Sequence, residues 1–279
     1  MKMLIFGKGY IANKFKAYFD GAEISDVRIE DISAVKAELE RVRPDVVVNC
    51  AGKTGRPNVD WCEDHKMETL FGNVTVPLIL AKACEELGVY MVHIGSGCVY
   101  EGYKDGVGYS EDDEPNFAGS YYSRTKAWGE RMLKDFAVLQ LRLRMPFDSI
   151  PGERNFITKI IKYKKVISVP NSISVLDDFL MAADALIAKK ATGIYNVTNP
   201  GTIDHQAILD MYIELVDPSY TYELFSLDEL AKVTKAGRSN CGLSVQKLED
   251  AGIHLRPVEL AVRESLITYR KNLENGVSM

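Results

Sequence analysis

The chain has 279 residues, of which 46% are hydrophobic and 26% are charged, and its formal net charge is -5. These are the values of an ordinary globular protein, so they exclude disordered, collagen-like and fibrous chains. An acidic chain without a basic cluster is also a poor candidate for binding nucleic acid.

The first half alternates short apolar runs with segments of helical period. Strands that alternate with helices form βαβ units, so this pattern predicts an α/β fold with a Rossmann-type, doubly wound parallel sheet. The run Val46-Val47-Val48 is typical of a parallel strand that is covered on both faces. The predicted strands are 3–6, 23–27, 45–50, 90–94 and 138–143, and the predicted helices include 32–42, 76–87 and 122–135.

After Pro146 the rhythm changes, and the sequence predicts a smaller C-terminal substrate-binding lobe that leaves a cleft beside the sheet. Residues 1–150 would form the Rossmann domain, with 190–215 returning to it, and residues 151–279 would form most of the lobe. The predicted helices here are 155–163, 178–189 and 257–275, and the predicted strands are 166–169 and 194–197.

The N-terminus runs directly into an apolar strand and has none of the features of a signal peptide. No apolar stretch approaches the about 18 residues that a membrane span needs. The five cysteines are widely spaced, odd in number and without Cys-x-x-Cys, which argues against a disulfide framework or a zinc site. We therefore expect a cytoplasmic protein without a metal site or a membrane partner.

A glycine-rich turn directly after the first predicted strand is the first candidate site. Gly7-Lys8-Gly9-Tyr10-Ile11-Ala12 fits the pattern G-x-G-x-x-G/A and opens a helix. In this context the first glycine makes the turn, the second lets the backbone approach a pyrophosphate, and the small third residue lets helix and strand pack. The alternative is a turn without a ligand, and the surrounding βαβ pattern favours binding of a dinucleotide.

The side chain that selects between NAD and NADP should follow the second predicted strand. Asp26, Arg28, Glu30 and Asp31 lie together there. An acidic residue suits a ribose hydroxyl, whereas Arg28 could pair with a 2′-phosphate. We expect NADPH, with NADH as the alternative.

Two further constellations carry chemistry. Tyr122 and Lys126 are four residues apart in a predicted helix and so share a face. A neighbouring ammonium and a nicotinamide cation would lower the pKa of the phenol from its ordinary value near ~10.

Ser96 and Cys98 follow the fourth strand, and they point to the same side if the chain stays extended. The alternative for Cys98 is a small buried hydrophobe, and His93 is expected to be a core histidine.

In order and spacing, these motifs resemble the extended short-chain dehydrogenase/reductase family, whose members act mainly on nucleotide sugars. Residues 46–52 look like the family's third strand and cofactor-contacting turn. The blocks 55–63, 154–159 and 193–201 resemble the reductase half of plant rhamnose synthases, although the glycine loop is one residue shorter here. The cofactor contacts that we expect are Gly7, Lys8, Gly9, Tyr10, Ile11, Arg28, Asp31, Ile32, Ala51, Gly52, Lys53, Asn73, Tyr122 and Lys126.

The resemblance implies a bifunctional 3,5-epimerase/4-keto-reductase that converts UDP-4-keto-6-deoxy-D-glucose to UDP-L-rhamnose with NADPH. Cys98 and Lys159 would serve the epimerisation as acid and base. Tyr122 would protonate O4 of the sugar while Lys126 holds the cofactor ribose. The implied catalytic residues are Ser96, Cys98, Tyr122, Lys126 and Lys159, and the substrate contacts are Arg56, Asn58, Ser96, Asn155, Lys159 and Arg238, the last for the diphosphate.

Relatives that the sequence resembles leave two alternatives, a reductase without epimerase activity and a regulatory subunit. dTDP-4-dehydrorhamnose reductase only reduces, and it has no use for the pair of Cys98 and Lys159. GDP-fucose synthase both epimerises and reduces, and it shares the Ser-x-Cys pattern. A non-catalytic regulatory subunit of the same fold would not need Tyr122 or Lys126. The resemblance also implies a separate 4,6-dehydratase as the source of the substrate and leaves the oligomeric state open, with a homodimer as one option.

Overall fold

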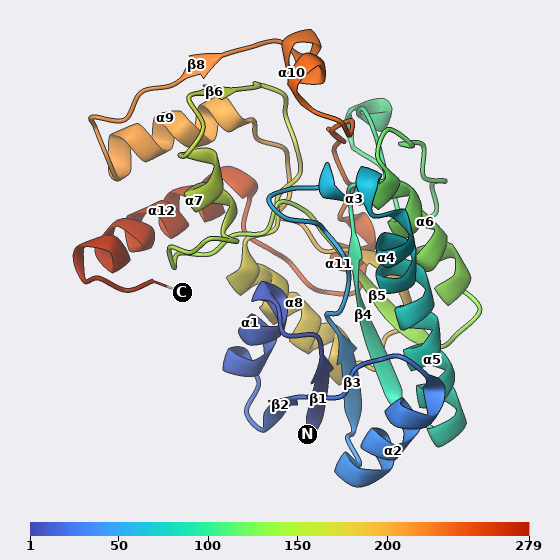
Figure 1. Cartoon of the computed structure of the whole chain (residues 1–279). Coiled ribbons are helices and arrows are strands. Elements are labelled where there is room, and N and C mark those ends of the chain that lie inside the picture. Colours follow the sequence, from blue (N-terminus) through green and yellow to red (C-terminus); the bar gives the residue numbers. More distant parts are fainter. Residues whose placement is uncertain (279) are drawn as a thin grey trace.

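A six-stranded parallel sheet forms the centre of the computed structural model, which describes residues 1–278 (Figure 1). The strand order β2-β1-β3-β4-β5-β7 changes direction between β1 and β3, so the sheet is doubly wound and has its switch point at these two strands. The predicted α/β class is therefore confirmed. The strands are β1 (Met3–Phe6), β2 (Ala22–Ile24), β3 (Val46–Asn49), β4 (Tyr90–Ser96), β5 (Val138–Leu143) and β7 (Gly193–Asn196).

Helices cover both faces of this sheet because its strands are apolar on both sides. On one face Phe15 of α1 meets Phe179 of α8 edge-on, with ring centroids 6.3 Å apart. On the other face Leu39 of α2 and Leu80 of α5 belong to a second core. The helices of the sheet layer are α1 (Tyr10–Tyr18), α2 (Ile32–Val42), α3 (Trp61–Asp64), α4 (Lys66–Leu70), a π-helical turn (Phe71–Thr75), α5 (Val76–Leu87), α6 (Tyr121–Leu133), α8 (Leu176–Ala188) and α11 (Gln246–Asp250).

A lobe with its own apolar core lies at the carboxyl end of the strands (Figure 1). Leu209 and Tyr269 contribute to this core from two helices that pack together. The lobe consists of α7 (Phe156–Ile160), α9 (His205–Leu215), α10 (Leu227–Val233), α12 (Val258–Glu274) and a small parallel sheet of β6 (Lys165–Val166) and β8 (Glu223–Leu224).

The chain passes between sheet and lobe several times. Within 190–215, β7 pairs with β5 in the main sheet, but α9 packs against α12 in the lobe. Conversely, α8 covers the sheet although it lies beyond residue 150. The division into 1–150 and 151–279 stays a proposal, and β7, α8 and α11 are elements of the second part that join the core of the sheet.

The described residues contain neither a candidate for a membrane-spanning helix nor a candidate group of metal-binding side chains. Over residues 1–278, none of the helices combines the length and the apolar character that crossing a bilayer requires. The same residues contain no group of three or more His, Cys, Asp or Glu side chains placed to hold a metal ion.

Candidate active site

The glycine-rich turn lies at the switch point of the sheet, between β1 and α1. Gly7 has a φ of +106°, and a Cβ there would lie 2.7 Å from the backbone nitrogen of Ala51, so only glycine fits. Gly9 is the N-cap of α1 without a side-chain cap, and a Cβ there would meet nothing within 4 Å. The first turn of α1 thus presents backbone N–H groups beside open space, an arrangement that fits a pyrophosphate.

The turn after β3 forms the opposite wall of this cradle. Asn73 is buried, and its amide accepts from the Lys53 N–H (2.8 Å) and donates to the Lys53 carbonyl (3.0 Å) and to Thr125 Oγ1 (3.1 Å). Asn73 therefore fixes the backbone at Lys53, directly after Ala51 and Gly52. The Lys53 side chain itself is exposed.

Of the charged residues that follow β2, Asp26 and Asp31 are engaged in local contacts, whereas Arg28 is exposed to solvent. Lys8 of the glycine turn pairs with Asp26 at 2.5 Å. Asp31 is the N-cap of α2, which begins at Ile32, so its carboxylate is already engaged with the helix. The Arg28 side chain is 88% exposed, which leaves its guanidinium accessible to a 2′-phosphate.

Three of the expected catalytic side chains converge at the carboxyl end of β4. The Tyr122 hydroxyl donates to Ser96 Oγ over 3.2 Å, and Lys126 Nζ donates to the Ile94 carbonyl over 3.0 Å. Tyr122 and Lys126 lie one turn apart on α6, so the helix brings both to the sheet. These contacts join the strand end to the helix that the sequence motif predicted.

The electrostatics of this group differ from the expectation. Burial, together with the neighbouring Cys98, holds the pKa of Tyr122 well above its ordinary value. Burial lowers the pKa of Lys126 to about 8. The protein alone therefore does not lower the pKa of the tyrosine as predicted, because burial disfavours the charged form of both side chains. At neutral pH Tyr122 keeps its proton.

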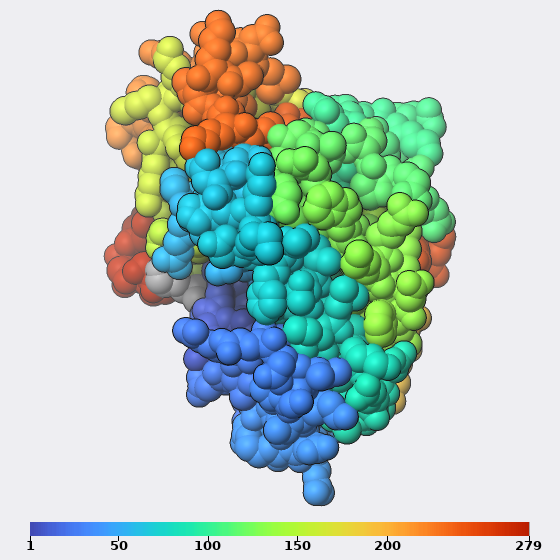
Figure 2. Space-filling model, turned by 45° about the vertical axis from the view of Figure 1, so that its right-hand side comes forward, coloured from blue at the N-terminus to red at the C-terminus, as the bar shows by residue number. Residues whose placement is uncertain are grey.

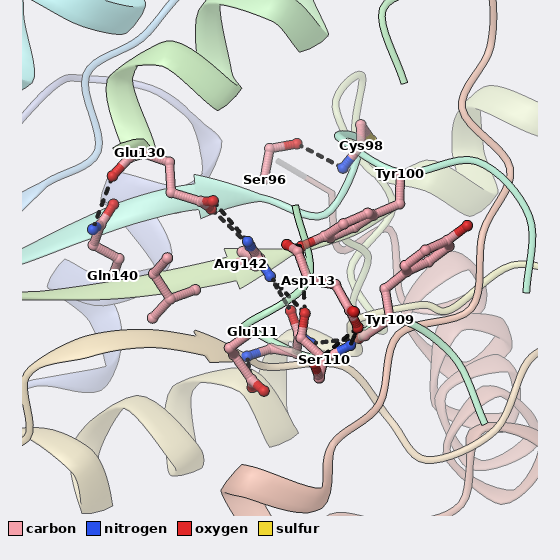
Figure 3. Close-up of polar contacts among 12 residues, drawn as sticks. Ser96, Cys98, Tyr100, Tyr109, Ser110, Glu111, Asp113, Glu130, Gln140 and Arg142 are labelled. Carbon is pink, nitrogen blue, oxygen red and sulfur yellow. Dashed lines mark hydrogen bonds and ion pairs between the residues drawn. The ribbon is translucent and has the colours of Figure 1, made fainter. Parts of the chain in front are cut away.

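Cys98 reaches the site by a turn of the chain. β4 ends at Ser96, and Ser96 Oγ accepts a hydrogen bond from the Cys98 N–H over 3.2 Å (Figure 3). The extended conformation that was assumed for this segment is thus absent, because the backbone folds back on the serine. Cys98 and Tyr122 nevertheless line the same cavity.

That cavity measures about 470 Å³, a size suited to a small ligand. Lys159 of α7 lines it from the lobe. Burial, with the positive charges of Arg154 and Arg238 nearby, lowers the pKa of Lys159. The predicted residues that line the cavity together are Asn58, Cys98, Tyr122, Lys159 and Arg238, whereas the exposed Arg56 is not among its walls.

The segment around Arg238 is attached across the cavity to the loop before α3. Asp60 Oδ1 accepts from Arg238 Nη1 (2.9 Å) and from the Ala236 N–H (2.9 Å), and Lys235 pairs with Asp64 at 2.6 Å. Figure 2 shows the light-blue and orange segments in contact on the surface. Within residues 1–278, only Nη1 of the Arg238 fork is engaged by protein acceptors, so its other donors suit a diphosphate.

Asn155, which the sequence predicted to contact the substrate, lies inside the protein at the start of α7. It is fully buried as the N-cap of α7, where its Oδ1 accepts from the Ile157 and Thr158 N–H groups. Its Nδ2 donates to Asp148 and to the Ile150 carbonyl. The whole amide is engaged inside the protein, so the predicted contact with substrate is replaced by a cap on the helix that carries Lys159.

Several buried polar groups were not singled out from the sequence. Arg142 of β5 forms a double hydrogen bond with Glu130 of α6 at 2.6 and 2.7 Å, and its guanidinium lies under the Tyr100 ring (Figure 3). Arg144, two residues further on, is equally buried beside Cys98. The sequence signal that could have revealed these two arginines is a charged residue within or just after an apolar strand.

His93 is the core histidine that the sequence predicted. It is 2% exposed, and burial holds its pKa well below 6.5.

Comparison with known proteins places these features in context. Residues 1–271 match the family model described as RmlD substrate binding domain. A bifunctional dTDP-4-dehydrorhamnose 3,5-epimerase/dTDP-4-dehydrorhamnose reductase of Arabidopsis thaliana is 45% identical over 249 residues, which cover 87% of this chain and 81% of that protein.

Two other similar proteins extend the comparison. A trifunctional UDP-glucose 4,6-dehydratase/UDP-4-keto-6-deoxy-D-glucose 3,5-epimerase/UDP-4-keto-L-rhamnose-reductase of the same plant is 43% identical, and the match covers 96% of this chain and 41% of that protein. The chain thus spans less than half the length of this relative. The crystal structure of a UDP-rhamnose synthase from Acanthamoeba polyphaga mimivirus has a TM-score of 0.92 at 33% identity, covering 96% of this chain and 99% of that one.

Proposed function

The chain belongs to the family of the RmlD substrate binding domain, and from that premise we propose that it is an NADPH-dependent 3,5-epimerase/4-keto-reductase. Its substrate would be UDP-4-keto-6-deoxy-D-glucose and its product UDP-L-rhamnose. The observation that carries this proposal is the single cavity that Tyr122 lines together with Cys98 and Lys159. A reductase alone would need the tyrosine but neither of the other two.

Reduction of the C4 ketone rests on the group at the end of β4. When bound in the cradle of the glycine turn, NADPH supplies the hydride. Tyr122 delivers its proton to O4, and its raised pKa means that the proton is present at neutral pH. Ser96, bonded to Tyr122, orients the hydroxyl and stabilises negative charge on O4. Lys126, one turn further along α6, is placed to hold the ribose.

Epimerisation uses the acidity of the C–H bonds beside the ketone. One group removes the proton from C3 or C5, the electron pair moves to O4 as an enolate, and the other group returns a proton to the opposite face. Cys98 lies at the strand end and Lys159 on α7 of the lobe, so the two enter the cavity from different elements. That separation suits chemistry on two faces of one ring.

Binding of the nucleotide would fall to the segments that line the cavity mouth. Arg238 is the proposed partner of the diphosphate, with Asn58 at the sugar and Arg56 at the exposed edge. The UDP preference is supported by the names of the viral relative and of the trifunctional plant relative, whereas the name of the bifunctional plant relative supports a dTDP-linked substrate for the same two activities.

The remaining features of this proposal concern the setting of the enzyme. We place it in the cytoplasm and assign formation of the 4-keto sugar to a separate 4,6-dehydratase. The exposed apolar side chains Met67, Phe71, Trp128 and Met132 on α4, the π-helical turn and α6 support a homodimer.

The deciding experiment is product analysis by NMR after incubation of the protein with UDP-4-keto-6-deoxy-D-glucose in deuterated water. Without NADPH, we expect deuterium at C3 and C5 of the keto sugar and no reduction. With NADPH, we expect UDP-L-rhamnose that carries deuterium at both carbons. Reduced sugar without deuterium would contradict the epimerase and leave the monofunctional reductase. No reaction with the UDP or the dTDP sugar would favour the regulatory subunit.

A further inference from the structure

Arg144 is a buried arginine whose guanidinium lies against Cys98. It is 1% exposed, and its Nη1 donates to Cys98 Sγ over 3.3 Å, to Ser239 Oγ over 3.1 Å and to the Gly97 carbonyl over 3.4 Å. Nη2 donates to the Ser239 carbonyl over 2.6 Å and to Asn171 Oδ1. Nε is buried and has no hydrogen-bond partner in the described part of the chain. Carbonyl, amide and hydroxyl oxygens make up the other acceptors besides the thiol, and none of them carries a negative charge.

The comparison with Arg142 shows what Arg144 lacks. Both are 1% exposed and two residues apart, but the Arg142 guanidinium is neutralised by the Glu130 carboxylate. Among residues 1–278, no carboxylate oxygen lies within 4.0 Å of the Arg144 guanidinium nitrogens. Burying a charge without a counter-ion is costly, so an anion beside Arg144 would be stabilised. Among the hydrogen-bond partners of Arg144 within residues 1–278, the Cys98 thiol is the one that readily becomes an anion by losing a proton.

We propose that Arg144 is a positioning residue for Cys98: it holds Sγ in the cavity and stabilises its thiolate form. A fixed positive charge in contact with a thiol favours the thiolate, which is the form that accepts a proton. The same guanidinium binds Ser239, next to Arg238, so it links the thiol to the segment proposed to bind the diphosphate.

Other ionisable groups also surround the Cys98 thiol. Tyr122 and Lys126 lie opposite on α6, and Cys241 packs beside it from the segment after Arg238. Lys159 and Arg238 line the same cavity. The tyrosine and Cys241 are uncharged at neutral pH, because burial raises the pKa of each. Of the cationic groups, the Arg144 guanidinium is the one in hydrogen-bond contact with Sγ.

This inference rests on the proposed role of Cys98 and assigns its direction. The thiolate takes the proton from carbon as the C–H bond breaks and the S–H bond forms, and the electron pair moves to O4. The Lys159 ammonium then gives its proton to the opposite face, aided by a lowered pKa that makes it the stronger acid. Exchange of both groups with water restores the starting protonation and introduces solvent deuterium.

The test is alkylation of the full-length protein by iodoacetamide, without substrate or cofactor, from about pH 6 to about pH 10. Mass spectrometry of peptides separates Cys98 from the other four cysteines. At about pH 7, we expect Arg144→Gln to slow alkylation of Cys98 at least about tenfold, and the difference to shrink as the pH rises towards about 10, because hydroxide removes the proton of a thiol without help from a guanidinium. Arg144→Lys, which keeps a charge, should retain most of the wild-type rate.

Ser239→Ala is the matched control, because it removes a hydrogen bond of Arg144 and leaves the charge in place. It should leave the pH profile unchanged. Equal slowing by Arg144→Gln at every pH would show a role in access alone and overturn the proposal, as would a wild-type rate at about pH 7. These outcomes do not depend on turnover, so the proposal can stand even where the epimerase activity fails.

Circular dichroism would reveal whether Arg144→Gln has lost its fold. In that case, a measurement on the wild-type protein tests the proposal. The ratio of its Cys98 alkylation rate at about pH 7 to that at about pH 10 should exceed the same ratio for glutathione by at least about tenfold. A ratio equal to or below that of glutathione overturns the assignment to Arg144.

Discussion

Tyr122 donates a hydrogen bond to Ser96 over 3.2 Å and so ties the first turn of α6 to the carboxyl end of β4. Ser96 is 5% exposed, and its Oγ also accepts from the Cys98 N–H. The serine therefore orders two side chains of the cavity, the hydroxyl that would protonate O4 and the thiol that would act at carbon. The arrangement of the site depends on this contact between a strand end and a helix.

Removal of the Tyr122 hydroxyl tests the proton donor of the reduction. We expect Tyr122→Phe to lower kcat for the keto sugar by about 10²–10⁴-fold, because the developing alkoxide at O4 loses its acid. Consumption of NADPH under saturating substrate is the measurement. Tyr121→Phe is the matched control on the same helix, since Tyr121 contacts Arg124 and Trp128 instead of the strand end. Equal loss in both variants would contradict the role of Tyr122.

Lys159 offers a way to separate the two proposed activities. Lys159→Met should abolish incorporation of deuterium at one or both carbons beside the ketone, because one partner of the acid/base pair is gone. It should still reduce a 4-keto sugar that already has the L configuration, since Tyr122 remains. Lys162→Met, three residues further on and exposed, should retain both activities. Unchanged deuterium uptake in Lys159→Met would remove the lysine from the mechanism.

We expect selection of the cofactor to depend on Arg28, because its guanidinium is exposed, whereas Asp31 caps α2. Arg28→Gln should raise KM for NADPH about tenfold, through loss of a charge-assisted contact with the 2′-phosphate, and leave KM for NADH unchanged. Arg131→Gln, an exposed arginine of α6, is the control for a general loss of positive charge. A parallel change for both cofactors in Arg28→Gln would exclude recognition of the 2′-phosphate.

Local patterns accounted for much of the fold and for part of the site. The strands at 3–6 and 138–143 and the helices at 32–42 and 76–87 have the predicted bounds, because burial on known faces sets the hydrophobic period. The helices α3, α4 and α9 to α11 were not predicted. Most of them are short, and tertiary contacts rather than periodicity hold such helices.

The long-range contacts of the site could not be predicted in the same way. Arg144 bonds to Cys98 and Ser239, which are 46 and 95 residues away in the sequence. The capping role of Asn155 depends on the conformation of its own loop and on Asp148. A local sequence pattern shows which residue types follow a strand, but it does not show which distant segment packs against them.

Because Asn155 caps α7, we expect its substitution to change the stability of the protein and not the binding of substrate, which the sequence predicted. Asn155→Ala should lower the free energy of unfolding by about 2 kcal/mol, because the cap is lost and buried partners of its amide lose their hydrogen bonds. Urea unfolding measures the effect. Ser226→Ala, at the exposed cap of α10, should cost less. An increase in KM for the sugar nucleotide without a loss of stability would restore the substrate-binding role of Asn155.

Lys126 predicts a pH dependence of stability whose sign follows from burial. Its pKa is about 8 in the folded protein, against 10.5 for an exposed lysine. Below about pH 8 both states hold the proton, and the folded state bears the cost of a buried charge. Between about pH 8 and pH 10.5 the unfolded state holds the proton and the folded state does not, so the free energy of unfolding rises with pH. The full rise is about 3 kcal/mol at about 1.36 kcal/mol per pKa unit.

Other groups also titrate in this range, so the comparison with Lys126→Met isolates the contribution of this lysine. We expect the free energy of unfolding of the wild type, minus that of Lys126→Met, to increase from about pH 8 to about pH 10 in urea titrations of the protein without cofactor. A difference that stays constant would mean that Lys126 is as well solvated in the folded chain as in the unfolded chain. A decrease would mean that the folded protein stabilises the ammonium, and the lysine proposed to hold the ribose would then be charged throughout the neutral range.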